Sequence, residues 1–333
     1  MKRRELLAAA AGATALAGCA RLEGLFTVPP ERRPIAAVFP GAAEDGGFAE
    51  SALRGLERIP ATFGVEIRHL ERVGLERERL LAAVRELAAA KPALVIVVGA
   101  ETSEATQRAA WEFPEQRFAV LQGTLLRPNL AAYVVEQPQS AWLAGAAAAL
   151  LTRSGTVGHV GVARDAYSAA ARAAFAAGVQ ATDPKARLLT GFTGTPERVP
   201  AFVAALADQG ADIAFAMPDA VRAGAADVAR PRGLRLVGAV ADWTARAPES
   251  FVAAAIADGG HAVLAAARDI HDNVFVGDLV RRFGLRVPAA VRLALAPDVP
   301  ETVRARTDEL GAQLVAGRIP IPERYAGPEF TPG

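Results

Sequence analysis

The stretch Lys91–Gly123, KPALVIVVGAETSEATQRAAWEFPEQRFAVLQG, decides the fold of this chain. Within it, Leu94–Val98 is a short, unbroken apolar run bounded by Pro92 and Gly99, which is typical of a strand buried on both faces. A helical segment follows, with acidic residues in its first turn, where the helix dipole favours negative charge. Arg117–Leu121 is the next apolar run. A strand, a helix and a second strand in this order predict a parallel sheet with a crossover helix.

Strands and helices alternate in the same way from Ile35 to about Ala316. This alternation predicts an α/β protein with two doubly wound parallel-sheet lobes. The polar segment Glu136–Gln139 contains a proline and breaks the pattern, so it is predicted to cross between the lobes. Such sheets bind ligands in the crevice outside the carboxyl ends of their strands. The loops that follow the strands are therefore where we look for a site.

The first twenty residues have a basic start, an apolar run and a small-residue end, which indicates a secretory signal peptide too short to span a membrane. Cys19, the only cysteine, ends the tetrapeptide Leu16-Ala17-Gly18-Cys19, which resembles a bacterial lipobox. We therefore expect a lipoprotein signal peptide over residues 1–18, acylation of the Cys19 thiol, and a tether over residues 19–33. The alternative is a plain signal peptide with a chance cysteine. A single cysteine allows no disulfide within the chain.

Composition argues against several classes of function. Apolar residues make up 52% of the chain and aromatic residues only 6%, so the core must be built mainly from small aliphatic side chains. The formal net charge of +1 gives no electrostatic footprint for nucleic acid. The chain has no nucleophile elbow, P-loop or dinucleotide fingerprint, and its four histidines show no metal-ligand spacing. We predict that the protein is not an enzyme and needs no metal or cofactor.

Several segments together resemble one family, the basic membrane protein (PnrA-like) substrate-binding lipoproteins of ABC importers. The resemblance covers about residues 35–322, and its motifs lie in the family's order: Asp45–Phe48 for the D-x-S-F-N loop, Lys91–Ile96 for KPDLVI, Phe113–Val120 for YP…KFAVID, Trp142–Gly161 for YLAG…GKVGFVG, and Val299–Pro322 for the terminal helix and GEIxVP. Each motif alone is weak, whereas five in order are specific.

The resemblance implies the type I periplasmic binding protein fold, in which three strands cross between two lobes and a ligand is enclosed between them. It places the first lobe at 34–136 plus 249–285 and the second at 137–248 plus 286–333. It also implies a monomeric solute-binding protein, anchored by lipid on the periplasmic side of the envelope. Its partners would be a small ligand, which is a purine nucleoside in many members of this family, and the permease of an ABC transporter.

The chain departs from the family pattern at polar positions that hold the ribose and base edge in the nucleoside binders. Gly47 and Ala49 replace a serine and an asparagine of the first loop. Gln122 and Val240 replace acids that follow strands, and a lysine expected near Ala257 is absent. Few charged anchors are left, so we expect a neutral ligand with a flat ring, rather than an amino acid or a phosphate.

Seven residues in the strand-to-helix loops are candidate ligand contacts. The aromatic ones can stack on a planar ligand, the aspartates can accept hydrogen bonds from sugar hydroxyls, and the glutamine can donate and accept at an amide or base edge. They are Phe48, Tyr167 and Trp243; Asp45, Asp219 and Asp242; and Gln122. The competing interpretation is structural: the aromatic side chains are core anchors, and the aspartates only cap helices.

Two functions remain open from the sequence. The first is a lipid-anchored binding protein that delivers a small polar molecule to an ABC importer. The second is an envelope lipoprotein of the same fold that binds a protein partner. A crevice lined by Phe48, Tyr167, Asp242 and Trp243 favours the first function, whereas a crevice filled by side chains favours the second.

Overall fold

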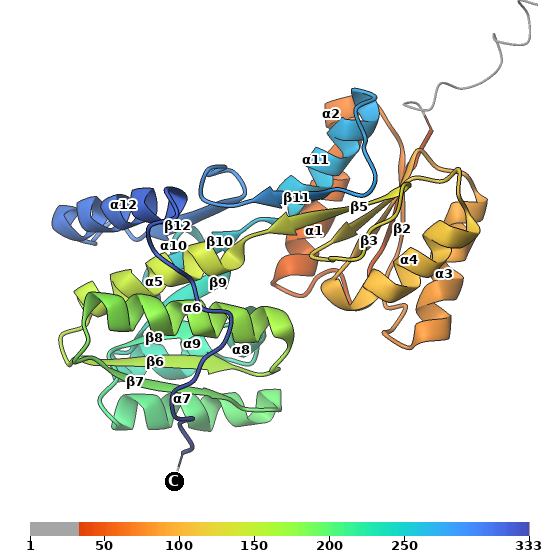
Figure 1. Ribbon diagram of the computed structural model, residues 1–333. Coiled ribbons are helices and arrows are strands. Elements are labelled where there is room, and N and C mark those ends of the chain that lie inside the picture. The colour runs from red at the N-terminus through yellow and green to blue at the C-terminus, as the bar shows by residue number, and fades with distance from the viewer. Residues whose placement is uncertain (1–32, 333) are drawn as a thin grey trace, which may run out of the picture.

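The protein consists of two α/β lobes that lie side by side, each built on a six-stranded sheet (Figure 1). The computed structural model describes residues 33–332. The predicted fold class, two largely parallel sheets with helices on both faces, is confirmed. No helix within the described residues is both long and apolar enough to cross a membrane.

The first sheet is parallel throughout, with strand order β11-β5-β4-β3-β1-β2. Its strands are β1 (Ile35–Val38), β2 (Ile67–Leu70), β3 (Leu94–Val98), β4 (Phe118–Leu121), β5 (Leu130–Val135) and β11 (Val280–Phe283). One face packs on α1 (Phe48–Glu57), α2 (Ile59–Phe63) and α11 (Gly259–His271), and the other on α3 (Arg77–Ala89) and α4 (Ser103–Glu112). Successive residues of the buried strand β3 enter opposite cores, as a sheet covered on both sides requires.

The second sheet has the order β12-β10-β9-β8-β6-β7, and only the edge strand β12 is antiparallel. Its strands are β6 (Thr156–Gly161), β7 (Arg187–Phe192), β8 (Ile213–Ala216), β9 (Arg235–Val240), β10 (Phe251–Ala257) and β12 (Val291–Leu295). One face packs on α5 (Gln137–Leu151), α6 (Ala166–Thr182) and α12 (Glu301–Val315). The other packs on α7 (Val199–Asp208), α8 (Pro218–Arg222) and α9 (Ala225–Ala229), with the short α10 (Trp243–Arg246) after β9.

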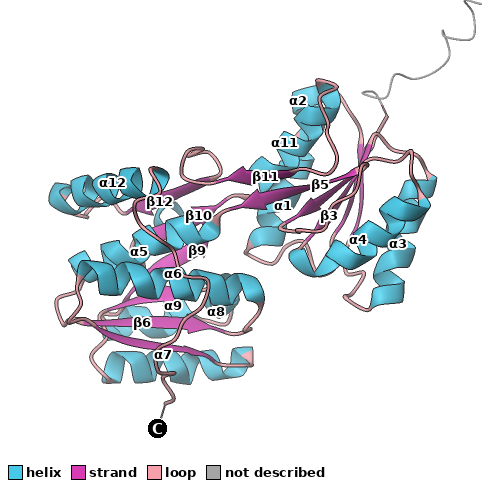
Figure 2. Cartoon of the chain, viewed as in Figure 1, coloured by secondary structure: helices cyan, strands magenta, loops and turns pink. Residues whose placement is uncertain are grey.

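Three segments connect the lobes (Figure 2): the β5–α5 junction, the β10–α11 junction, and the stretch between β11 and β12. Their positions correct the sequence analysis. Residues 251–257, assigned there to the first lobe, form β10, which pairs with β9 and β12 in the second sheet. The first lobe therefore resumes after Ala257, and not at residue 249. The strand β11 was missed, because the sequence Val280-Arg281-Arg282-Phe283 is short and half charged.

The helices α5 and α6 pack very closely because glycines meet at their contact. A methyl group built on Gly145 would lie 2.0 Å from the carbonyl oxygen of Phe175, and one on Gly178 would lie 2.0 Å from that of Trp142. Both helices lead from the crevice side to the far side of the second lobe, so they run in roughly the same direction. The helix α5 begins at Gln137, within the segment that was expected to break the pattern, because proline fits the first turn of a helix.

Candidate functional site

The crevice between the lobes lies at the carboxyl ends of both sheets, where the loop before α1 approaches the second lobe. A methyl group built on Gly47 would lie 3.2 Å from Cβ of Pro218, which opens α8. The Glu50 carboxylate, on α1, is 3.7 Å from the Arg246 guanidinium on α10. These contacts show that the loop predicted to carry ligand contacts does face the other lobe.

Phe48 and Tyr167, which were predicted to cover opposite faces of a ligand, contact each other from opposite lobes. Their ring centroids are 5.8 Å apart with a 57° angle between the ring planes. Phe48 packs against the cores of both lobes and approaches Gly259 at the second crossing. It is therefore both an anchor for its helix and an aromatic surface at the base of the crevice.

The hydroxyl of Tyr167 is buried, and no group in residues 33–332 forms a hydrogen bond with it. Burial, followed by the negative charges of Asp165 and Asp45, holds the pKa of Tyr167 well above its ordinary value. The hydroxyl is thus protonated at any physiological pH. An uncharged donor without a partner, beside an aromatic ring, is suited to a polar group on a flat ligand.

The three predicted aspartates have local roles. Oδ1 of Asp45 accepts hydrogen bonds from the backbone nitrogens of Gly47 at 2.7 Å and Glu50 at 3.1 Å, which fixes the start of α1. Asp219 accepts from the backbone nitrogens of Val162 and Ala163, and Asp242 caps α10 through Ala245 N. Oδ2 of Asp242 also lies 3.8 Å from the guanidinium of Arg292 on β12. Capping uses only Oδ1 of Asp45 and Oδ1 of Asp242. This leaves Oδ2 of Asp45 for a ligand hydroxyl, whereas Oδ2 of Asp242 also faces Arg292.

Gln122 and Trp243 are committed to the protein itself. The Gln122 amide pairs with the Val135 backbone on β5: Oε1 accepts from Val135 N at 2.6 Å, and Nε2 donates to Val135 O at 3.1 Å. The indole of Trp243 donates to Ala239 O at 3.1 Å and stacks on Phe251, with 5.2 Å between ring centroids. Both side chains brace strand ends in this structure.

Gln122 directly follows the fourth strand of the first lobe and Val240 ends the fourth strand of the second, and both have left-handed backbone, with φ of 63° and 69°. A β-branched residue such as valine rarely adopts this conformation, and such strain concentrates at functional sites. These are the positions where the sequence has lost acids relative to the family it resembles. The backbone kink is present, but a structural amide and a buried valine now occupy it.

The sequence analysis did not select Gln137, which stands at the first crossing between the lobes. It is 0% exposed, and neither Oε1 nor Nε2 has a hydrogen-bond partner among the described residues. A fully buried amide with both ends unpaired is unusual in a folded protein. The available signal was the break at Glu136–Gln139, which was interpreted only as a connection.

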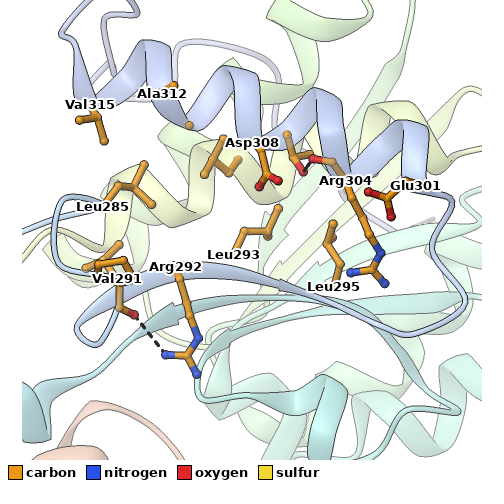
Figure 3. A pocket seen from close by; sticks show the side chains of 14 residues that line it. Leu285, Val291, Arg292, Leu293, Leu295, Glu301, Arg304, Asp308, Ala312 and Val315 are labelled. Carbon is orange, nitrogen blue, oxygen red and sulfur yellow. Dashed lines mark hydrogen bonds between the residues drawn. The ribbon is translucent and has the colours of Figure 1, made fainter.

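A separate pocket of about 440 Å³ lies between α12 and β12, away from these residues (Figure 3). Leu293 and Leu295 of β12 line it from below, and Arg304 and Asp308 of α12 lie at its upper side. Nε of Arg304 donates to Val299 O at 3.3 Å, so this side chain is partly used within the lobe. None of the seven predicted ligand residues lines this pocket.

Two α/β lobes, three crossings and aromatic side chains facing each other across the crevice define the class of two-lobed solute-binding proteins. More particularly, the chain belongs to the family described as "ABC transporter substrate-binding protein PnrA-like", which it matches over residues 33–324. The family resemblance found in the sequence is thereby confirmed. Members of this family are the substrate-binding components of transporters, which take a small-molecule ligand to a permease.

Similar proteins agree with this assignment. A "Purine-binding protein" from Brucella abortus (strain 2308) is 22% identical over 296 residues, 87% of this chain and 83% of that protein. "Basic membrane protein A" from Borreliella burgdorferi is 21% identical over 298 residues, 86% of this chain and 87% of that protein. Among solved structures, an ABC transporter solute-binding protein from Conexibacter woesei has a TM-score of 0.73 at 24% identity. That match covers 87% of this chain and 99% of the other.

Proposed function

We propose that this protein is a lipid-anchored, periplasmic substrate-binding protein that carries a purine nucleoside, or a related flat-ring molecule, to the permease of an ABC importer. The observation that carries the proposal is the unpaired, buried hydroxyl of Tyr167 beside the ring of Phe48, one residue from each lobe. The two rings touch in this structure, which by itself fits a protein-partner function, but the family assignment favours a transported solute. The name of the Brucella relative supports a purine ligand.

The crevice favours a neutral ligand. Stacking on an aromatic side chain contributes roughly 1–3 kcal/mol per base in proteins that bind single-stranded nucleic acids. The second oxygen of Asp45 is suited to a hydroxyl of a sugar. An amino acid would bring two charged ends, and the guanidinium groups of Arg246 and Arg292 already lie 3.7 Å from Glu50 and 3.8 Å from Asp242. Burial of unpaired charges is costly, so a zwitterion is disfavoured.

Ligand entry requires the lobes to move apart. A ring between two aromatic faces needs roughly 7 Å between those faces, twice the usual carbon–carbon contact distance. The centroids of Phe48 and Tyr167 are closer than this. We infer that rotation about the three crossings separates the two rings and that closure then holds the ligand between them.

The experiment that tests the ligand class is calorimetry of the chain without its first 18 residues, with adenosine, guanosine, hypoxanthine, leucine and ribose. We expect saturable binding of at least one purine and at least a tenfold loss of affinity in Phe48→Ala, from the lost stacking. Thermal unfolding serves as a second readout, because a ligand at 100 times its Kd adds about 2.7 kcal/mol. Tight binding of leucine without any purine would contradict the proposed ligand. If no small molecule binds, the protein-partner function becomes the better account.

The lipid anchor rests on the sequence, because Cys19 lies outside the described residues. Each buried methylene of an acyl chain contributes roughly 0.8 kcal/mol to membrane binding, so several chains hold a protein firmly. Replacing Cys19→Ser should move most of the full-length protein from the membrane fraction to the soluble fraction of fractionated cells. Unchanged retention in the membrane would rule out acylation at this position.

A further inference from the structure

The starting point is the unpaired amide of Gln137. Its side chain is completely buried, and neither its oxygen nor its nitrogen has a partner within residues 33–332. Burying an unpaired amide costs free energy, so a group outside the protein chain is the expected partner. Among the residues that the structure describes, the hydroxyl of Tyr167 is likewise buried without a hydrogen-bond partner.

The direction in which Gln137 points follows from the helix that carries it. Gln137 lies on the same face of α5 as Ala141, Ala144 and Ala148, which are fully buried. These alanines belong to the core between α5 and the second sheet. Gln137 is the first residue of this stripe, at the end of α5 that adjoins the first crossing. Its amide therefore lies where the helix meets the carboxyl ends of the strands.

Tyr167 lies at the same end of the neighbouring helix. The helices α5 and α6 touch at Gly145 and Gly178, and both begin on the side that faces the first lobe (Figure 1). Gln137 is in the first turn of α5, and Tyr167 is in the first turn of α6. The two unpaired groups thus lie at the same end of two neighbouring helices, and the ring of Phe48 is 5.8 Å from that of Tyr167.

We propose that Gln137 and Tyr167 form the polar subsite of the crevice and recognise a ring edge on which an N–H stands next to a C=O, that is, a lactam such as a 6-oxopurine. This proposal rests on the proposed function and specifies its ligand. The Gln137 oxygen accepts from the ring N–H. The carbonyl oxygen of the ring has two lone pairs and accepts from both the Gln137 amide and the Tyr167 hydroxyl.

The chain itself contains an example of the recognition proposed. The Gln122 amide pairs with one N–H and one C=O of Val135, at 2.6 and 3.1 Å. A lactam presents the same pair of groups to Gln137. An aminopurine edge fits less well, because its ring nitrogen has a single lone pair and cannot accept from both donors. The raised pKa of Tyr167 means that the hydroxyl keeps its proton and is available as a donor.

The test compares inosine, which has the lactam edge, with purine riboside, which lacks the oxygen and the ring N–H. Calorimetry would be done on the wild type, Gln137→Met, Tyr167→Phe and the control Gln180→Met. Gln180, near the far end of α6, donates to Ala186 O at 3.2 Å. We expect wild type and control to bind inosine at least about tenfold more tightly than purine riboside, and both crevice variants to lose most of that preference.

Each outcome is decisive. If inosine binds and Gln137→Met keeps the wild-type preference within twofold, the subsite is wrong while the proposed function survives. If neither nucleoside binds the wild type, the subsite fails, and the proposed function fails with it only when adenosine, guanosine and hypoxanthine do not bind either. Thermal unfolding of both variants shows whether they fold. Because their polar groups are unpaired, we expect melting temperatures equal to or above that of the wild type.

Discussion

Two regions of this molecule carry a glutamine beside a crossing between the lobes, and the two side chains differ completely in their surroundings. At the end of β4, both polar atoms of the Gln122 amide are paired with the Val135 backbone. At the start of α5, neither polar atom of the Gln137 amide has a partner among the described residues. The same chemical group is thus structural in one place and available in the other. Residue type and position in a loop are therefore insufficient to identify a ligand contact.

The comparison extends to the aromatic side chains. Trp243 follows a strand of the second lobe, yet its indole nitrogen is bonded to Ala239 O and its ring is stacked on Phe251. Tyr167 also follows a strand of that lobe, but its hydroxyl is unpaired within the described chain and its ring meets Phe48 of the other lobe. The two side chains therefore differ in whether their polar atom already has a hydrogen-bond partner, and not only in how exposed they are.

The largest effect is expected from breaking the contact between α5 and α6, which places Gln137 and Tyr167 at the same end of the helix pair. A methyl group on Gly145 would already lie 2.0 Å from a backbone oxygen of α6, so Gly145→Val must push the helices apart. We expect the free energy of unfolding to fall by about 3 kcal/mol or more in urea titrations, together with ligand affinity. In the control Gly41→Ala, nothing lies within 4 Å of the added methyl group, and the change should stay within about 0.5 kcal/mol.

A matched pair of variants tests the contrast between the glutamines directly. Gln122→Met leaves the Val135 backbone groups unpaired, so the free energy of unfolding should fall by about 1–3 kcal/mol. Gln137→Met removes an amide that has no partner in the described chain, so the same measurement should show no loss. Equal destabilisation by the two substitutions would show that the difference between the two sites is not real.

A smaller effect concerns pH. Burial and nearby carboxylates raise the pKa of Tyr167, so the hydroxyl stays protonated in the folded protein while it ionises near pH 10 in the unfolded chain. Its contribution is present below pH 10 and is lost as pH rises beyond that value. Urea unfolding between pH 8 and pH 11 should therefore show a shallower decline for Tyr167→Phe than for the wild type. Parallel curves would mean that this hydroxyl is not buried in solution.

The sequence was sufficient to predict the fold because the strongest signals are local. The apolar run Leu94–Val98 was placed to the residue. The error at β10 arose because a buried strand that serves as a crossing has the same composition as any other buried strand. The lobe that β10 joins is decided by its pairing with β9 and β12, and strand pairing cannot be predicted from the local sequence.

The candidate site was less predictable for a physical reason. Parallel sheets place their sites at strand ends, and two of the loops selected on that ground meet between the lobes, where Phe48 contacts Tyr167. Hydrogen bonds made after folding decide which polar groups remain free. Gln122, at a left-handed backbone position, turns its amide onto the neighbouring strand. Gln137 remained hidden because a polar residue next to a proline in a connecting segment resembles an ordinary solvated turn.

A crystal structure of the complex with guanosine tests the central claim most directly. Our account predicts that the base lies between the lobes against Phe48, with its lactam edge within about 3.2 Å of the Gln137 amide. The Phe48 and Tyr167 rings should be farther apart than the 5.8 Å found here. Guanosine bound in the pocket between α12 and β12 instead, or a crevice still filled by the two rings at saturating ligand, would contradict it.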